Sequence, residues 1–186
     1  ETVLCLAKAS GHKVEMEQHP VQLKQGDWKI NGKIDAVIDG VLVDVKSCSP
    51  FGFKKFKEGL NDDNDSFGYR MQLESYQHAG QASSTLPFTY ATPMGFVAVD
   101  KQNGSVHYSE HEKQLMVSTR IESIVVAVEH LTSAHLPRKD AVADGKSGNL
   151  KLPTVCSYCA FKQPCWKAAA NGGKGLRGFS YASGPV

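Results

Sequence analysis

The spacing of apolar and polar positions along the chain predicts an α/β protein. Apolar residues at helical spacing and helix-capping residues indicate helices, whereas β-branched and apolar runs bounded by turn residues indicate strands. The expected helices cover residues 1–9, 53–59, 66–83 and 115–131, and Ser66 is the expected cap of the third. The expected strands cover residues 12–24, 28–38, 41–47, 94–100 and 105–111.

The order of these elements restricts the topology. A helix, three strands, a helix and a strand give the order α-β-β-β-α-β. Pro50 and Gly52 break the chain after the third strand, and Asn103-Gly104 is the turn of a second hairpin. The long helical crossover between residues 46 and 94 permits parallel pairing of the strands on either side. A mixed central sheet flanked by helices is therefore expected. Residues 138–152 read as a polar loop, and glycines mark the chain after residue 171.

The first hairpin places charged residues on one face. Asp39-Gly40 is a strong two-residue turn, because a type I′ turn needs positive φ at both central positions. With this turn Ala36 faces Val43, and Asp35 faces Asp44. Side chains alternate along a strand, so Lys46 lies on the same face as Asp44.

Two opposed carboxylates destabilise a sheet unless something offsets their repulsion. A divalent cation between Asp35 and Asp44 would do so, and Mg²⁺ favours a few carboxylates together with water and phosphate oxygens. A metal-bound water, a polarised phosphate and the nearby Lys46 are what phosphodiester hydrolysis requires. The alternative interpretation is an edge hairpin whose charges point into water.

A second pair of polar residues lies on the helix that follows. Gln72 and Tyr76 are one helical turn apart and share a face. They could position a nucleotide's phosphate or base near Lys46, with Arg70 assisting at the phosphate. The alternative is a partly exposed helix whose Tyr76 packs against the core.

Three of the five cysteines are clustered near the end of the chain. Cys156, Cys159 and Cys165 have spacing suited to metal ligation, and this spacing fits both structural zinc and an iron–sulfur cluster. The alternative is three cysteines without a metal. An odd number of cysteines with three clustered argues for a reducing compartment and against a secreted disulfide framework.

These motifs together resemble the PD-(D/E)XK nuclease superfamily. Asp35 followed by Asp44-Val45-Lys46 is similar to its catalytic core, and Gln72 to Tyr76 resembles the Gln-x-x-x-Tyr motif of the RecB-like branch. Cys156, Cys159 and Cys165 resemble the C-terminal cysteine triplet of the branch members that carry an iron–sulfur cluster, which include CRISPR-associated and phage exonucleases. The matches span residues 35 to 166.

The resemblance implies a restriction-endonuclease-like core over residues 1–137 and a cysteine-rich metal-cluster segment over 138–186 within the same compact domain. It implies that Asp35, Asp44 and the carbonyl of Val45 hold Mg²⁺ or Mn²⁺, with Glu1 as a candidate further ligand. Lys46 would orient or deprotonate the attacking water and help neutralise the phosphate. The cysteines would bind a [4Fe–4S] cluster, with Zn²⁺ as the alternative, and the fourth ligand is not identified.

Composition and charge add a candidate surface. Hydrophobic content of 41% and charged content of 22% are ordinary for a globular protein, and no apolar run approaches a membrane span. Residues 138–186 hold eight basic and two acidic residues, a net charge of +6, whereas the rest carries −4. Such a basic segment suits DNA, with Lys162 and Lys167 as candidate contacts. The alternative is a solvated tail. No signal peptide is visible, and a start at Glu1 suggests a trimmed or partial chain.

The sequence therefore predicts a metal-dependent DNA nuclease. An exonuclease that acts on single-stranded or duplex ends in recombination, repair or phage DNA metabolism is the leading hypothesis, with a helicase or recombinase as a candidate partner. We expect it in the cytoplasm of a bacterial, archaeal or phage-infected cell. The alternative is a non-catalytic DNA-binding or scaffold module with a structural iron–sulfur or zinc site.

Overall fold

The computed structural model of the chain describes residues 1–81, 91–130, 140–143, 150–157, 166–168 and 182–185. The chain divides into two compact units, Glu1–Val125 and Val126–Val186. The predicted boundary between residues 137 and 138 lies outside the described residues. No helix in the described ranges is long and apolar enough to cross a membrane.

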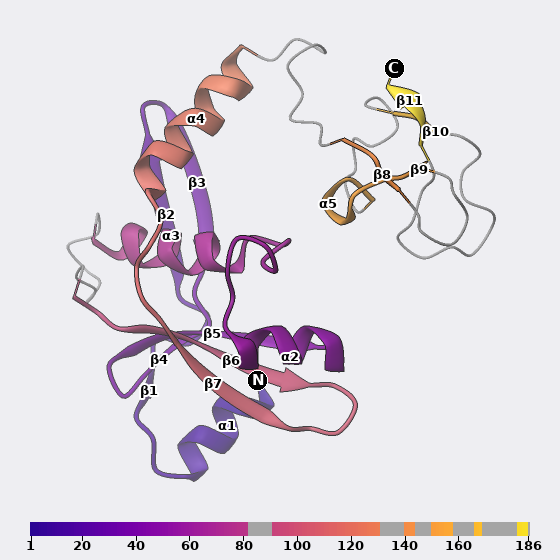
Figure 1. Cartoon of the computed structure of the whole chain (residues 1–186). Coiled ribbons are helices and arrows are strands. Elements are labelled where there is room, and N and C mark those ends of the chain that lie inside the picture. Colours follow the sequence, from indigo (N-terminus) through magenta and orange to yellow (C-terminus); the bar gives the residue numbers. More distant parts are fainter. Residues whose placement is uncertain (82–90, 131–139, 144–149, 158–165, 169–181, 186) are drawn as a thin grey trace. The chain divides into compact units, whose positions relative to one another are not determined.

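A five-stranded mixed sheet forms the centre of the first unit (Figure 1). In spatial order its strands are β1 (Val14–Glu15), β4 (Ala36–Ile38), β5 (Val41–Cys48), β6 (Met94–Asp100) and β7 (Val106–His111). β5 and β6 are parallel, and the other neighbouring pairs are antiparallel. The crossover between β5 and β6 carries α2 (Pro50–Glu58) and α3 (Tyr69–Gln81). The predicted mixed sheet flanked by helices is confirmed.

The two faces of the sheet are covered by different helices. One face carries Leu42 and Phe96, and it packs against Phe56 of α2 and Leu73 of α3 in the hydrophobic core. The Phe56 and Phe96 ring centroids lie 5.5 Å apart. On the other side lies α1 (Thr2–Ala9), and Figure 1 shows α3 above the sheet and α1 below it. The first helix is therefore where the sequence predicts it.

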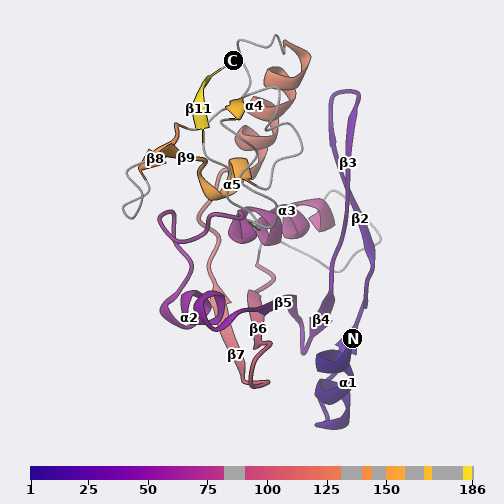
Figure 2. The same ribbon diagram turned by 90° about the vertical axis from the view of Figure 1, so that its right-hand side faces the viewer.

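A narrow two-stranded ribbon rises from the sheet and passes α3 (Figures 1 and 2). It consists of β2 (Pro20–Gln25) and β3 (Trp28–Lys33), which pair only with each other. The predicted continuous strands over 12–24 and 28–38 are therefore wrong. Met16 and Gln18 interrupt the first with φ of 53° and 51°.

Two helix starts also differ from the prediction, for local reasons. Pro50 does not break the chain but lies in the first turn of α2, where a missing N–H costs no hydrogen bond, and Ser49 caps that helix. The cap of α3 is Asp65, not Ser66, because its two carboxylate oxygens accept the N–H groups of Tyr69 and Arg70, each at 2.9 Å. The predicted end of this helix near residue 83 lies outside the described residues. The next helix, α4 (Val117–Glu129), lies within the predicted range.

The second unit contains short elements. β8 (Val142–Ala143) pairs with β9 (Leu150–Lys151) inside the segment predicted as a polar loop. α5 (Thr154–Ser157) carries Cys156, and β10 (Trp166–Ala168) pairs with β11 (Ala182–Pro185). Cys159, Cys165 and Lys162 lie outside the described residues, and the side chain of Lys167 is not described. The predicted cluster ligands and these two DNA contacts therefore stay predictions.

Candidate active site

The hairpin between β4 and β5 has the predicted turn and register. Asp39 and Gly40 have φ of 50° and 81°, as a type I′ turn requires. Ala36 is opposite Val43 in the ladder. Asp35 precedes this ladder, and Asp44 follows Val43 in β5, so the turn brings the two carboxylates together at the far end of the hairpin.

Asp44 is a buried carboxylate with an unusual environment. The residue is only 3% exposed. Burial raises the pKa of its carboxyl, the charge of Lys46 opposes this, and the nearby carboxylate of Asp35 raises it further. Its Oδ2 is buried, and its partner is the ammonium of Lys46, whose Nζ lies 2.6 Å away. Buried charge is costly unless it is compensated, and here one ammonium, that of Lys46, faces the carboxylates of both Asp44 and Asp35, which makes the two carboxylates candidate ligands for a cation.

Asp35 is held from two sides. Its Oδ2 accepts the backbone N–H of Val45 at 2.7 Å, and its Oδ1 accepts Nε2 of Gln18 at 2.9 Å. The backbone N–H of Gln18 also donates to the carbonyl oxygen of Asp35. Gln18 is a non-glycine residue at positive φ, a conformation that costs energy and that clusters at functional sites. No sequence pattern pointed to Gln18, because glutamine carries no turn signal.

Lys46 connects the hairpin to α3. Its Nζ donates to Oε1 of Gln72 at 2.9 Å, and Nε2 of Gln72 donates to the hydroxyl of Tyr76 at 2.9 Å. This orientation of the amide follows from chemistry, since an ammonium can only donate. Lys46 Nζ also lies 5.1 Å from the ring centroid of Tyr69, a contact that no sequence pattern indicated. The structure thus brings together all five residues predicted to be catalytic, while their roles stay predictions.

Tyr76 is fixed against the ribbon by a glycine. A Cβ placed on Gly32 of β3 would lie 2.7 Å from Cε1 of Tyr76, so the ring occupies the space that a side chain would need. The backbone of Lys33 hydrogen-bonds the phenol, and burial raises its pKa above the ordinary value. Tyr76 is therefore a neutral phenol near physiological pH. Its oxygen already interacts with Gln72 and Lys33, which leaves its own proton for a further acceptor.

Two other predicted site residues are placed differently. Arg70 is only 6% exposed. Its guanidinium donates to Asp62 and to Oε1 of Gln114, each at 2.6 Å. The predicted phosphate contact of Arg70 stays a prediction, and in this structure the guanidinium is paired with the exposed carboxylate of Asp62. Glu1 is exposed and precedes α1, and no hydrogen bond or ion pair joins its side chain to the described residues of the site.

The donor set fits a hard divalent cation. Within the described ranges no group of three or more His, Cys, Asp and Glu residues could hold a metal. Asp35 and Asp44 form a pair of carboxylates instead, and Mg²⁺ is commonly bound by one or two carboxylates with waters and substrate phosphates. The carboxylates of Asp35 and Asp44 repel each other and share one ammonium, that of Lys46, so a divalent cation would offset their remaining negative charge.

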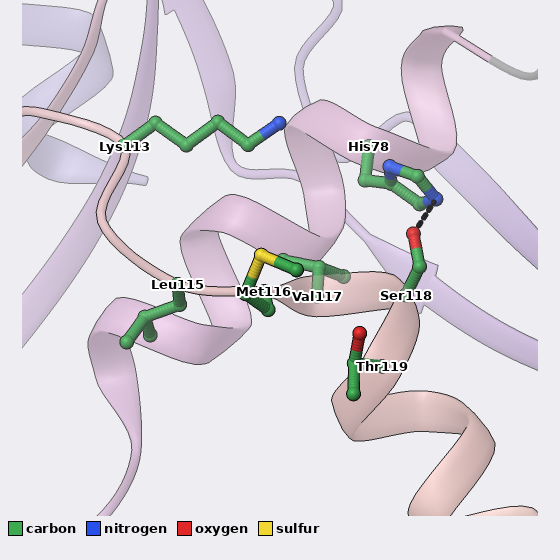
Figure 3. A pocket seen from close by; sticks show the side chains of 7 residues that line it. All are labelled: His78, Lys113, Leu115, Met116, Val117, Ser118 and Thr119. Atoms are coloured by element: carbon green, nitrogen blue, oxygen red, sulfur yellow. Dashed lines mark hydrogen bonds between the residues drawn. The ribbon is translucent and has the colours of Figure 1, made fainter.

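A separate pocket of about 120 Å³ lies where α3 and the start of α4 meet (Figure 3). It is lined by His78, Lys113 and residues 115–119. Ser118 Oγ and His78 Nε2 are 3.4 Å apart, as drawn in the figure, and burial lowers the pKa of His78. None of these residues belongs to the set from Asp35 to Tyr76, so this pocket adds nothing to the candidate active site.

A comparison with protein families agrees with this interpretation of the residues. The profile of the PD-(D/E)XK nuclease superfamily matches residues 5–166. A crystal structure of a candidate exonuclease from Eubacterium rectale is 17% identical and has a TM-score of 0.44, with 62% of this chain and 43% of that chain covered. The crystal structure of SSO0001 is 14% identical and has a TM-score of 0.46, with 88% and 64% covered. The chain thus spans less than two thirds of either solved structure. No curated protein matches the chain significantly.

Proposed function

The chain belongs to the PD-(D/E)XK nuclease superfamily, and we propose that it is a divalent-metal-dependent DNA nuclease that acts on DNA ends. The observation that carries this proposal is a set of contacts that joins Gln18 to Asp35, Asp35 to the N–H of Val45 beside Asp44, and Asp44 through Lys46 and Gln72 to Tyr76. These contacts join two carboxylates, an ammonium and a phenol in one site. A site of this composition suits hydrolysis of a phosphodiester.

Asp35, Asp44 and the carbonyl of Val45 would hold Mg²⁺ or Mn²⁺. When bound, such an ion stabilises charge that develops on the phosphate and lowers the pKa of a coordinated water. The protein's own contribution is to fix the carboxylates, which it does through Val45 N–H and Gln18 on Asp35. Partners of this kind keep ligands in the geometry that a metal requires.

Lys46 and Tyr76 would act on the substrate directly. Lys46 carries the positive charge nearest Asp44, and Gln72 holds its amine in place. A scissile phosphate bound beside Asp44 would receive hydrogen bonds from this ammonium. The phenol of Tyr76, whose proton is not used by Gln72, would donate to a second phosphate or sugar oxygen. Positioned donors of this type stabilise charge in the transition state without reorganisation.

We also propose that the protein belongs to the RecB-like branch and that Cys156, Cys159 and Cys165 bind an iron–sulfur cluster or zinc. The Gln72–Tyr76 hydrogen bond supports the first point. Cys156 is a free cysteine on α5. Iron, sulfide and zinc analysis of anaerobically purified protein tests the second point. The Cys159→Ser protein is the control and should lose the metal, and wild-type protein with neither metal would contradict the proposal.

The test of the nuclease uses end-labelled linear DNA and circular DNA, each single-stranded and duplex, with Mg²⁺ or Mn²⁺ added. We expect progressive digestion of linear DNA, no cleavage of circles, and no activity with a chelator. Asp44→Asn protein is the matched control and should be inactive. Cleavage of circles would show an endonuclease, and a wild-type protein that cleaves none of the four substrates would refute the proposal.

A further inference from the structure

The ribbon of β2 and β3 has one face on which every residue except Pro20 is polar. The register pairs Lys24 with Lys29, Gln22 with Asn31 and Pro20 with Lys33, so these residues lie on the same face. All six are exposed. The opposite face carries Val21 and Leu23, which are buried in the core, and β2 contacts α3. The ribbon is thus anchored on one side and presents the other to solvent.

The charges on this exposed face are all of one sign. It carries three lysines and no carboxylate, and Lys24 lies directly opposite Lys29. Like charges opposed across two strands destabilise a sheet, so this arrangement does not serve the fold. Among the described residues none of these three lysines forms an ion pair, whereas other exposed lysines do. Lys13 lies 3.0 Å from Glu15, and Lys54 lies 3.5 Å from Glu58.

The ribbon leads directly to the candidate active site. Lys33 is two residues before Asp35, and its backbone hydrogen-bonds the phenol of Tyr76. Lys29 lies four residues further from the site, about 13 Å along an extended strand. Successive phosphates of one DNA strand are separated by about 3.4 Å along the duplex axis, so the lysines span roughly the first four nucleotides beyond Asp35.

We propose that this face, defined by Lys24, Lys29 and Lys33, binds the phosphate backbone of DNA and guides the strand to Asp35 and Asp44. The inference rests on the proposed nuclease function and assigns the substrate path at that site. Nε2 of Gln22 donates to Oδ1 of Asn31 at 2.8 Å, which leaves the amide nitrogen of Asn31 as a further donor for phosphate. A polyanion would also relieve the repulsion between Lys24 and Lys29.

The test removes two charges that lie away from the carboxylates. Lys24→Gln/Lys29→Gln protein is compared with wild type in binding a labelled DNA duplex across a series of salt concentrations with chelator present. Each phosphate contact contributes about 0.9 to the slope of log K against log salt concentration. We expect the slope to fall by about 1.8, and KM for cleavage to rise with kcat unchanged. Lys13→Gln/Lys54→Gln protein loses the same charge from lysines paired with carboxylates and should keep the wild-type slope.

The double variant should fold at least as well as wild type, because it loses a like-charge repulsion. Thermal unfolding checks this, and Lys24→Arg/Lys29→Arg protein should retain both the slope and KM. If wild type binds and cleaves DNA while the double variant keeps the wild-type slope and KM, the ribbon proposal is overturned and the nuclease stands. An equal decrease of the salt slope in the Lys13→Gln/Lys54→Gln control would also overturn the ribbon proposal. Binding of the wild-type protein to RNA and not to DNA would do the same. A wild-type protein that neither binds nor cleaves DNA would overturn both proposals.

Discussion

Gly32→Ala should separate the position of Tyr76 from the stability of the fold. The added Cβ would lie 2.7 Å from Cε1 and 3.4 Å from Cδ1 of Tyr76, and 3.5 Å from Cγ2 of Val21. Carbon atoms prefer separations of about 3.5–4.0 Å, so the Tyr76 ring must move by about 1 Å. The ring cannot move freely, because its hydroxyl accepts a hydrogen bond from Gln72.

The size of both effects follows from this displacement. Overpacking costs about 1–3 kcal/mol, and replacing glycine by alanine inside a strand returns about 0.5–1 kcal/mol. We therefore expect a loss of roughly 1–2 kcal/mol in the free energy of unfolding. A catalytic group misplaced by about 1 Å can lower the rate about 100-fold. The expected fall in kcat is thus much larger than the loss of stability would suggest.

The assay measures kcat and KM on end-labelled linear DNA, and unfolding in urea measures stability. Gly95→Ala is the matched control, because its Cβ would lie 2.5 Å from Cε2 of Tyr108, away from the site. It should lose stability but retain kcat. In a Tyr76→Ala background the Gly32 substitution should cost little more, since the crowded ring is gone. A Gly32→Ala protein that is destabilised but retains the wild-type kcat would refute the reasoning.

Four further predictions follow from the site and the core. Asp44→Asn should abolish cleavage yet raise the metal-free melting temperature at neutral pH. The folded-state pKa of Asp44 is raised, so this carboxyl contributes stability below its unfolded pKa of about 3.9. That contribution is lost as the pH rises through the folded-state pKa. Thermal unfolding with chelator from acidic to neutral pH should show the difference vanish in acid. Lys46→Ala should lose cleavage while calorimetry shows metal affinity retained, since an ammonium is not a metal ligand, and a collapse of that affinity would contradict the division of roles. Gln18→Ala should weaken metal binding or activity about 10–100-fold, as loss of a ligand's hydrogen-bond partner commonly does, whereas unchanged values would remove it from the site. Phe56→Ala should lower the free energy of unfolding by about 3–5 kcal/mol in denaturant titrations, because it empties a core position beside Phe96.

The parts of this structure that the sequence predicted are those set by local rules. The hairpin register follows from Asp39-Gly40, whose backbone conformation only a few residues adopt. The shared face of Gln72 and Tyr76 follows from helical periodicity. Parallel pairing of β5 and β6 follows from the length of the crossover.

The parts that were missed depend on contacts between distant segments. The positive φ of Gln18 is maintained by its bonds to Asp35, and nothing in its neighbours predicts it. Arg70 was expected to assist at the phosphate, yet its guanidinium donates to Asp62 and Gln114, which lie 8 and 44 residues away in the sequence. The contact between Tyr76 and Gly32 joins a helix to a ribbon some forty residues earlier in the sequence, and a sequence pattern carries no such information.

The parallel pairing of β5 and β6 has a consequence for how the protein folds. Leu42 pairs with Met94, about fifty residues away, whereas Ala36 pairs with Val43 across a two-residue turn. Closing the longer loop costs about 2 kcal/mol more in chain entropy. The β4–β5 hairpin can therefore form early and unite Asp35, Asp44 and Lys46. We expect the crossover helices to dock later, so that the two carboxylates come together before Gln72 and Tyr76 reach their places.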